Sequence, residues 1–179
     1  MKKRLYVLAL ALAGLILIVF AAEKTMDIYN GSLEDRVNAL AKIQPGLGTV
    51  MIEYGDRFAN TYYAAKGGNW GLAQYQLKEA IEIQEVGEIT RPKNAPLLAS
   101  FEHAYLDPLE KDIRSKDWAS FEKDYQAAVE GCNGCHKATG HGYVEYKLPA
   151  QPVEAYINFN LKTDPVGNVE AGEEHEENK

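Results

Sequence analysis

The sequence predicts an all-α protein, an antiparallel four-helix bundle followed by an extended C-terminal segment. Three observations lead to this prediction. Apolar residues recur at steps of three and four along most of residues 45–136. The segments with this period are separated by short stretches that contain helix-capping residues, glycine or proline. No stretch shows the alternation of a β-strand. Helices joined by such short connections pack as antiparallel neighbours.

The N-terminus has the pattern of an export signal. Lys2, Lys3 and Arg4 precede residues 5–22, a run of 18 residues without a charge. A basic start before an apolar run is typical of a signal peptide, and this run also just reaches the length that spans a bilayer. A cleaved signal and an uncleaved membrane anchor therefore both remain open. Either one places residue 23 onward in the periplasm, free or anchored to the inner membrane by residues 5–22.

Residues 23–44 read as a tether and a short helix. Ser32 has the chemistry of a helix N-cap, and Leu33, Val37 and Leu40 follow at helical spacing. The next residue, Pro45, marks either a break or the first turn of the next helix. Residues 45–165 are then expected to form the main domain.

Two long helices are predicted at the start of that domain. The first runs from Leu47 to a Gly67-Gly68 stop, and Asn69 can cap the second, which continues to Gly87. The apolar stripe of the first helix contains Leu47, Val50, Met51, Tyr54, Phe58, Thr61, Tyr62 and Ala65. Met51 is the only methionine that falls in the predicted domain.

The third and fourth helices complete the predicted bundle. The third covers residues 96–113, and we expect Pro108 to bend it. Asp117 caps the fourth, whose apolar face contains Trp118, Phe121, Tyr125, Ala128, Val129 and Cys132.

A short motif stands at the end of the fourth helix: Cys132-Asn133-Gly134-Cys135-His136. This is the C-x-x-C-H pattern of covalent c-type haem attachment. Each thiol can bond one haem vinyl group, and the adjacent histidine can then ligate the iron as its proximal ligand. These are the only two cysteines in the chain. The motif therefore predicts a single covalent haem c, and export fits covalent haem attachment.

The same residues have two other possible uses. A redox-active dithiol belongs beside a βαβ pattern, which is absent here. Zinc could be bound by Cys132, Cys135, His136 and His141. However, the neighbouring Cys135 and His136 would be strained as ligands of one tetrahedral metal. Haem is the favoured interpretation.

A four-helix bundle with C-x-x-C-H in its last helix resembles the cytochrome c-prime and cytochrome c-556 group. The resemblance covers about residues 47–136, and the chain departs from it by running on for 43 residues after the motif. It implies a Met or bulky apolar residue on the distal haem face, about four turns before a Gly-rich helix end. Met51 lies 15 residues before Lys66-Gly67. The resemblance also implies a homodimer that pairs through the first two helices.

The sixth iron ligand decides the predicted function. A Met51 thioether would make a low-spin electron carrier, whereas an open position would admit nitric oxide or carbon monoxide. Met51 could also simply fill core space. His103 and His141 are rival ligands, and Met51 or Tyr54 could be a steric lid over five-coordinate iron. Tyr54 and Tyr125 are expected to contact the cofactor.

The leading hypothesis is an exported monohaem cytochrome that transfers electrons to and from periplasmic partner proteins. A gas-binding or sensing haem protein is the alternative. The sequence contains no separate acid/base constellation, so we do not expect an enzyme.

Charge and the C-terminal segment complete the predictions. Without Lys2, Lys3 and Arg4 the chain has 16 basic and 26 acidic residues, a net charge of −10, which disfavours nucleic acid as a partner. We expect residues 143–152 to be extended and to cover the haem edge, using Tyr143, Val144, Tyr146 and Leu148. Residues 166–179 are rich in glutamate and are expected to be disordered.

Overall fold

The computed structural model describes residues 28–167. Within this range the all-α prediction is confirmed: every regular element is a helix, and the sole strand-like pairing is an isolated bridge between Asn69 and Thr163. The chain divides into two compact units, residues 1–44 and 45–179. Residues 5–22 lie outside the described range. None of the helices that the structure describes has the length and apolar character to span a bilayer.

The first unit contains the short helix α2 (Leu33–Lys42). The hydroxyl of Ser32 accepts a hydrogen bond from the amide of Asp35 at 3.2 Å, so the predicted N-cap is confirmed. Leu33, Val37 and Leu40 are exposed on this helix.

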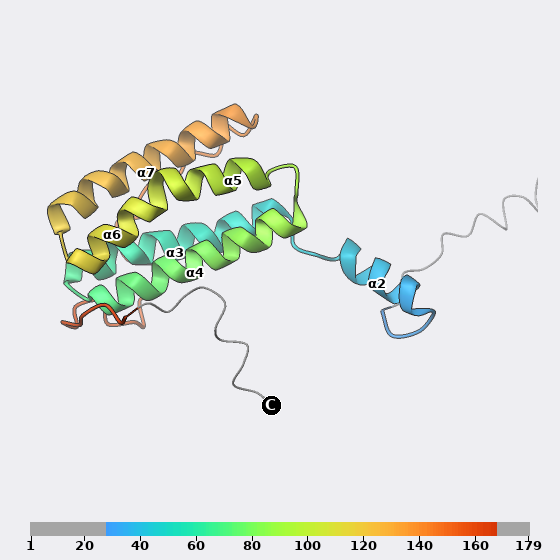
Figure 1. Ribbon diagram of the computed structural model, residues 1–179, viewed down its shortest axis with the longest axis horizontal. Coiled ribbons are helices and arrows are strands. Elements are labelled where there is room, and N and C mark those ends of the chain that lie inside the picture. The colour runs from blue at the N-terminus through green and yellow to red at the C-terminus, as the bar shows by residue number, and fades with distance from the viewer. Residues whose placement is uncertain (1–27, 168–179) are drawn as a thin grey trace, which may run out of the picture. The chain divides into compact units, whose positions relative to one another are not determined.

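The second unit begins with two helices that pack along their length, α3 (Leu47–Gly67) and α4 (Trp70–Thr90) (Figure 1). Gly68 ends α3 in the left-handed conformation, with φ of 74°, which glycine adopts without steric cost. The side chain of Asn69 accepts a hydrogen bond from the amide of Leu72 at 3.3 Å and caps α4. The tight connection makes the two helices antiparallel neighbours.

The next stretch differs from the single bent helix that was predicted. It consists of α5 (Ala95–Phe101), a π-helical turn η1 (Glu102–Leu106) and α6 (Asp107–Ser115). In the π-helical turn the amide of Asp107 donates to the carbonyl of Glu102. Pro108 follows immediately, and its missing N–H and bulky ring disrupt the regular i→i−4 bonding. The π-helical turn therefore lies where the proline prevents regular α-helical bonding.

Helix α7 (Trp118–Ala138) carries the C-x-x-C-H motif. One carboxylate oxygen of Asp117 accepts hydrogen bonds from the amides of Ala119 and Ser120, both at 3.1 Å, as the predicted cap requires. The helix continues beyond Cys132 and includes the complete motif.

The core of the second unit is rich in aromatic side chains. It receives residues from α3, α4, the α5–η1–α6 segment and α7, and the largest that are fully buried are Tyr125, Phe58 and Phe121. The rings of Phe58 and Tyr125 are stacked with their centroids 4.3 Å apart. Through these contacts α3 packs against α7.

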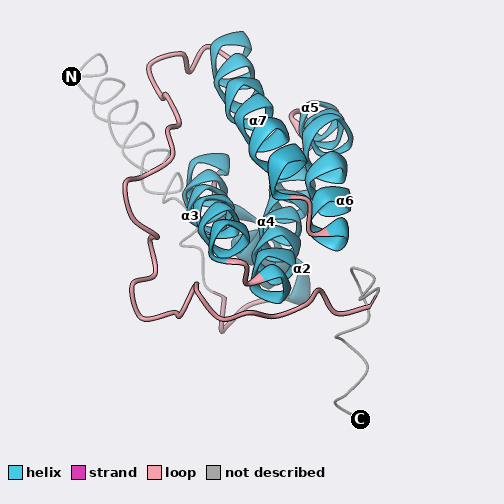
Figure 2. Ribbon diagram, turned by 90° about the vertical axis from the view of Figure 1, so that its left-hand side faces the viewer, coloured by secondary structure: helices cyan, strands magenta, loops and turns pink. Residues whose placement is uncertain are grey.

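Residues 143–166, here termed the strap, leave the end of α7 and run past α3 and α4 (Figure 2). Tyr146 and Leu148 pack against the core, whereas Tyr143 and Val144 are exposed. Further along, the Asn60 side chain donates to the carboxylate of Glu154 at 2.9 Å.

The far end of the strap reaches the α3–α4 connection. There the Asn69 side chain donates to the carbonyl of Asn158 at 3.0 Å, and Phe159 is buried. Val166 exchanges two hydrogen bonds with the Gln74 side chain. The remainder of the predicted acidic tail, residues 168–179, lies outside the described range.

Candidate functional site

The motif occupies the last turns of α7, where its two cysteines differ in environment. Cys132 is 9% exposed and belongs to the aromatic core, whereas Cys135 is half-buried. Residues three apart on a helix are neighbours on its surface. The two thiols are therefore adjacent, one inside the domain and one at its edge.

The imidazole of His136 is held by a hydrogen bond. Its Nδ1 lies 2.7 Å from the backbone carbonyl of Val144. A carbonyl can only accept, so Nδ1 is the donor, and in a neutral imidazole the lone pair is then on Nε2. A hydrogen bond of this kind is characteristic of metal-ligating histidines, because it fixes the tautomer and the ring orientation.

The other polar residue of the motif, Asn133, holds the strap. Its amide nitrogen donates to the carbonyl of Tyr146 at 3.0 Å, and its oxygen accepts from the amide of Tyr146 at 2.7 Å. The motif is therefore connected to the strap at two points, through His136 and through Asn133.

Tyr54 on α3 has a buried hydroxyl that lacks a partner. The residue is 5% exposed, and its hydroxyl is one of two buried side-chain polar atoms in the described residues without a hydrogen bond. Burial raises the pKa of Tyr54 well above its ordinary value, and the nearby Cys132 thiol adds to this effect. The ring of Phe101 meets Tyr54 edge-on at 6.3 Å. Leaving such a hydroxyl unpaired is costly.

Met51 lies one turn before Tyr54 on the same helix. It is half-buried and packs against the aromatic core. Residues three apart share a helix face, so the Met51 side chain lies on the face that brings Tyr54 toward Cys132.

These features fit a covalently bound haem. Two adjacent thiols, an imidazole with a free Nε2, a thioether on the facing helix and an unpaired hydroxyl beside the buried thiol form a suitable donor set. An additional group at this position would give the Tyr54 hydroxyl the partner that the described residues do not provide.

Tyr125 was predicted to contact the cofactor, and the structure gives it a full set of core contacts. It lies two turns before Cys132 and is completely buried. Its hydroxyl lies 3.1 Å from the carbonyl of Phe58 and 3.1 Å from the hydroxyl of Tyr146. Only its ring is available for a further contact.

The rival histidines face solvent. The side chain of His103 is 75% exposed, and its Nδ1 lies 3.2 Å from Asp107. His141 is exposed and contacts the Thr139 hydroxyl at 3.3 Å. Neither side chain points into the core beside Cys132.

The zinc alternative is also poorly supported by the geometry. In the described part of the chain, the donor cluster compact enough for a metal consists of Glu102, His103 and Asp107, all on one surface turn. The four zinc-ligand candidates of the motif region do not assemble into such a cluster.

The thiol environment counts against dithiol exchange. Burial raises the pKa of Cys132 to about 12, and burial also raises the pKa of Cys135. Exchange requires the thiolate, and reactive dithiols have lowered pKa values. The folded protein therefore suppresses this chemistry at Cys132.

One contact at the site was missed in the sequence. A Cβ atom on Gly131 would lie 2.6 Å from the ring of Tyr105, which belongs to η1. The π-helical turn thus packs directly on the α7 backbone before Cys132. A glycine inside an otherwise regular helix was the available signal.

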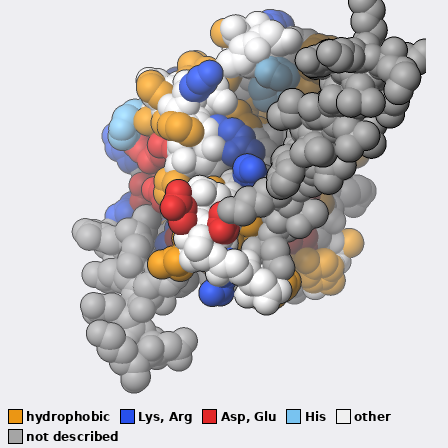
Figure 3. Space-filling model, turned by 90° about the vertical axis from the view of Figure 1, so that its right-hand side faces the viewer, with side chains coloured by type: hydrophobic (Ala, Val, Ile, Leu, Met, Phe, Trp, Pro, Cys, Tyr) orange, Lys and Arg blue, Asp and Glu red, His pale blue; other side chains and the backbone are white. Residues whose placement is uncertain are grey.

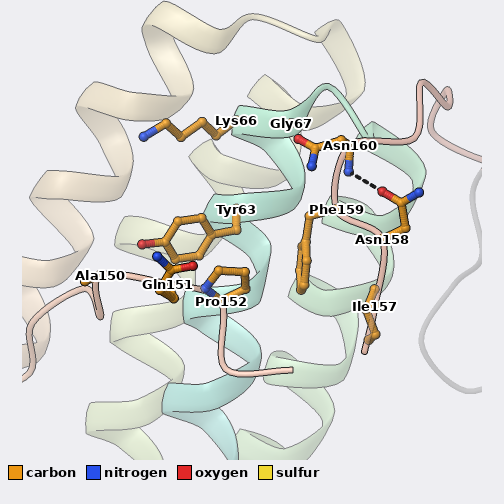
Figure 4. A pocket seen from close by; sticks show the side chains of 10 residues that line it. All are labelled: Tyr63, Lys66, Gly67, Ala150, Gln151, Pro152, Ile157, Asn158, Phe159 and Asn160. Carbon is orange, nitrogen blue, oxygen red and sulfur yellow. Dashed lines mark hydrogen bonds between the residues drawn. The ribbon is translucent and has the colours of Figure 1, made fainter. Parts of the chain in front are cut away.

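A cavity of about 500 Å³ lies away from the motif (Figure 4). It is bounded by the C-terminal part of α3 and by the strap, and it is lined by Tyr63, Lys66, Gly67, Ala150, Gln151, Pro152, Ile157, Asn158, Phe159 and Asn160. The contact between Tyr62 and Trp118 shows that this end of α3 adjoins the start of α7. The cavity is therefore not part of the motif site.

The face drawn in Figure 3 carries both acidic and basic side chains, without separation of the two signs.

Comparison with protein-family models, with curated proteins and with solved structures finds no match to this chain.

Proposed function

We propose that this protein is an exported, monohaem c-type cytochrome that transfers electrons, and that its helices form a four-helix bundle around the haem. One observation carries the proposal. The C-x-x-C-H motif ends a helix with Cys132 directed into the core, while His136 commits Nδ1 to a carbonyl and leaves Nε2 free. That is the arrangement a proximal haem ligand needs.

Each of these residues would have its own role. Cys132 and Cys135 would anchor the haem covalently, and His136 and Met51 would supply the iron with its nitrogen and thioether ligands. The bound haem supplies one-electron iron chemistry. The buried aromatic side chains exclude water, and the Tyr54 hydroxyl offers a hydrogen bond beside Cys132. Partner proteins in the periplasm would dock near Cys135, which is the more exposed of the two thiols.

A second candidate function is binding of nitric oxide or carbon monoxide at a five-coordinate iron. The unpaired Tyr54 hydroxyl favours it, because a buried donor can stabilise a polar bound diatomic molecule. In this alternative Met51 is a steric neighbour and not a ligand.

Expression of the full chain together with a haem-maturation system tests the leading proposal. We expect purified protein with one haem that stays attached in a denaturing gel and gives the pyridine haemochrome spectrum of a two-thioether haem. Cys132→Ser and Cys135→Ser should each reduce covalent attachment. A colourless product, or a product that contains zinc, would refute the haem assignment.

The spectrum of the reduced protein separates the two functions. A low-spin spectrum and slow binding of carbon monoxide support electron transfer with Met51 bound. A high-spin spectrum and rapid binding of carbon monoxide support the gas-binding alternative.

A further inference from the structure

A series of aromatic side chains crosses the core between the motif and the other end of α7. Adjacent ring centroids are 5.6 Å apart for Tyr54 and Phe58, 4.3 Å for Phe58 and Tyr125, 4.9 Å for Tyr125 and Tyr62, and 5.5 Å for Tyr62 and Trp118. We call these five residues the aromatic series. It starts beside the buried Cys132 and ends at Trp118, which is partly exposed.

The tyrosines of the series differ in where their protons can go. The hydroxyl of Tyr125 contacts the Phe58 carbonyl and the Tyr146 hydroxyl, and neither is a base. The hydroxyl of Tyr62 instead donates to the carboxylate of Glu122 at 3.3 Å, and Glu122 is exposed. A phenol that loses an electron becomes strongly acidic, so the site with a carboxylate acceptor retains the oxidised state.

We infer that Tyr62, with Glu122 as its proton acceptor, is a redox-active tyrosine that supplies electrons to the haem through Tyr125 when a peroxide oxidises the protein. This inference rests on the proposed haem. Each oxidised tyrosine loses one electron from its ring and one proton from its hydroxyl, and the Tyr62 proton moves to Glu122. Reduction of one hydrogen peroxide to two waters takes two electrons and two protons. Tyr62 supplies one electron and a second tyrosine of the aromatic series supplies the other; the peroxide takes its two protons from solvent, and the two protons that the phenols release, the one from Tyr62 by way of Glu122, return to solvent.

This role explains why the core contains tyrosines where packing requires only an aromatic ring. Phe58 shows that a phenylalanine ring fits the stack, yet Tyr54, Tyr62 and Tyr125 bury phenols in the same core. A buried hydroxyl must be desolvated, which an apolar ring avoids. Electrons that move along the aromatic series toward the haem would leave the oxidised residue at Tyr62, near the protein surface, and not at the motif.

The test is freeze-quench electron paramagnetic resonance of the haem-loaded full chain after mixing with hydrogen peroxide. Both the unmodified chain and Met51→Ala are tested, because Met51 as the sixth ligand would slow the access of peroxide to the iron. We expect a tyrosyl radical signal. Tyr62→Phe should abolish most of it, and Glu122→Gln should reduce its yield severalfold. Tyr156→Phe is the matched control, because Tyr156 is 85% exposed and lies outside the series. The tyrosyl radical signal of this variant should equal that of the protein with Tyr156.

Peptide mapping by mass spectrometry gives a second readout. Peroxide-dependent oxidation should appear at Tyr62 and Trp118, and in Tyr62→Phe the oxidation of Trp118 should fall, because the aromatic series is interrupted. Equal radical yield in Tyr62→Phe, or oxidation confined to the exposed Tyr143 beside the motif, would overturn the inference. Haem content is measured first. A preparation without haem defeats both proposals, whereas a haem-containing protein without the Tyr62 radical defeats only this one.

Discussion

Replacing Asn133 by Ala removes two of the three hydrogen bonds that attach the strap to the motif and leaves the one between His136 and Val144. Each of the two removed bonds involves the backbone of Tyr146, and the environment is partly buried. A hydrogen bond contributes about 0.5–1.5 kcal/mol net, and a buried group left without a partner costs about 1–3 kcal/mol. The substitution should therefore lower the free energy of unfolding by roughly 1–3 kcal/mol.

Urea denaturation followed by circular dichroism measures this change. With an m-value of about 1–3 kcal/mol/M for a small domain, the urea midpoint should fall by about 1 M. Because the strap is attached directly at Tyr146, limited proteolysis should also cut residues 141–152 faster in the variant. Gln126→Ala is the control, since Gln126 is an exposed position on the same helix. A midpoint for Asn133→Ala equal to that of the control would refute the reasoning.

Three further predictions follow from individual contacts. Met51→Ala in the haem-loaded protein should convert a low-spin spectrum to a high-spin one and accelerate carbon monoxide binding; an unchanged spectrum would exclude Met51 as a ligand. Gly67→Ala should destabilise the fold by about 1–3 kcal/mol through overpacking, because a Cβ there would overlap the backbone carbonyl oxygen of Phe159. Gly48→Ala, where nothing lies within 4 Å, should leave the thermal midpoint unchanged or raise it. Asp112→Asn should raise the urea midpoint at neutral pH, since burial raises the pKa of Asp112 and its Oδ2 is unpaired. The folded state binds this proton more tightly than the unfolded chain does, so the cost of the charge grows as pH rises above 3.8. The advantage of the variant should therefore shrink as pH falls toward that value, and a lower midpoint at neutral pH would contradict the argument.

Local chemistry explains why most helix ends could be predicted. The caps at Ser32, Asn69 and Asp117 each depend on one side chain reaching an amide two or three residues later. The end of α3 depends on Gly68, whose left-handed conformation is specific to its own backbone. Such features need no knowledge of the tertiary structure.

Other features depend on partners that are distant in the sequence. The strap has no periodic pattern, and its contacts join residues far apart, such as Asn60 with Glu154 and Asn69 with Asn158. The π-helical turn before Pro108 is similar, because Tyr105 on that turn packs against Gly131 of another helix. A proline alone predicts a disruption but not its form.

The candidate site combines both kinds of information. The sequence identifies His136 as a predicted ligand, but the state of its ring depends on the carbonyl of Val144, eight residues later. The chain can return to that position because Gly140 has a φ of 82° and the amide of His141 donates to the carbonyl of His136 at 2.7 Å. Spacing within the motif thus predicts which atoms could meet a metal. The turn after the motif determines which of the two imidazole nitrogens is free to do so.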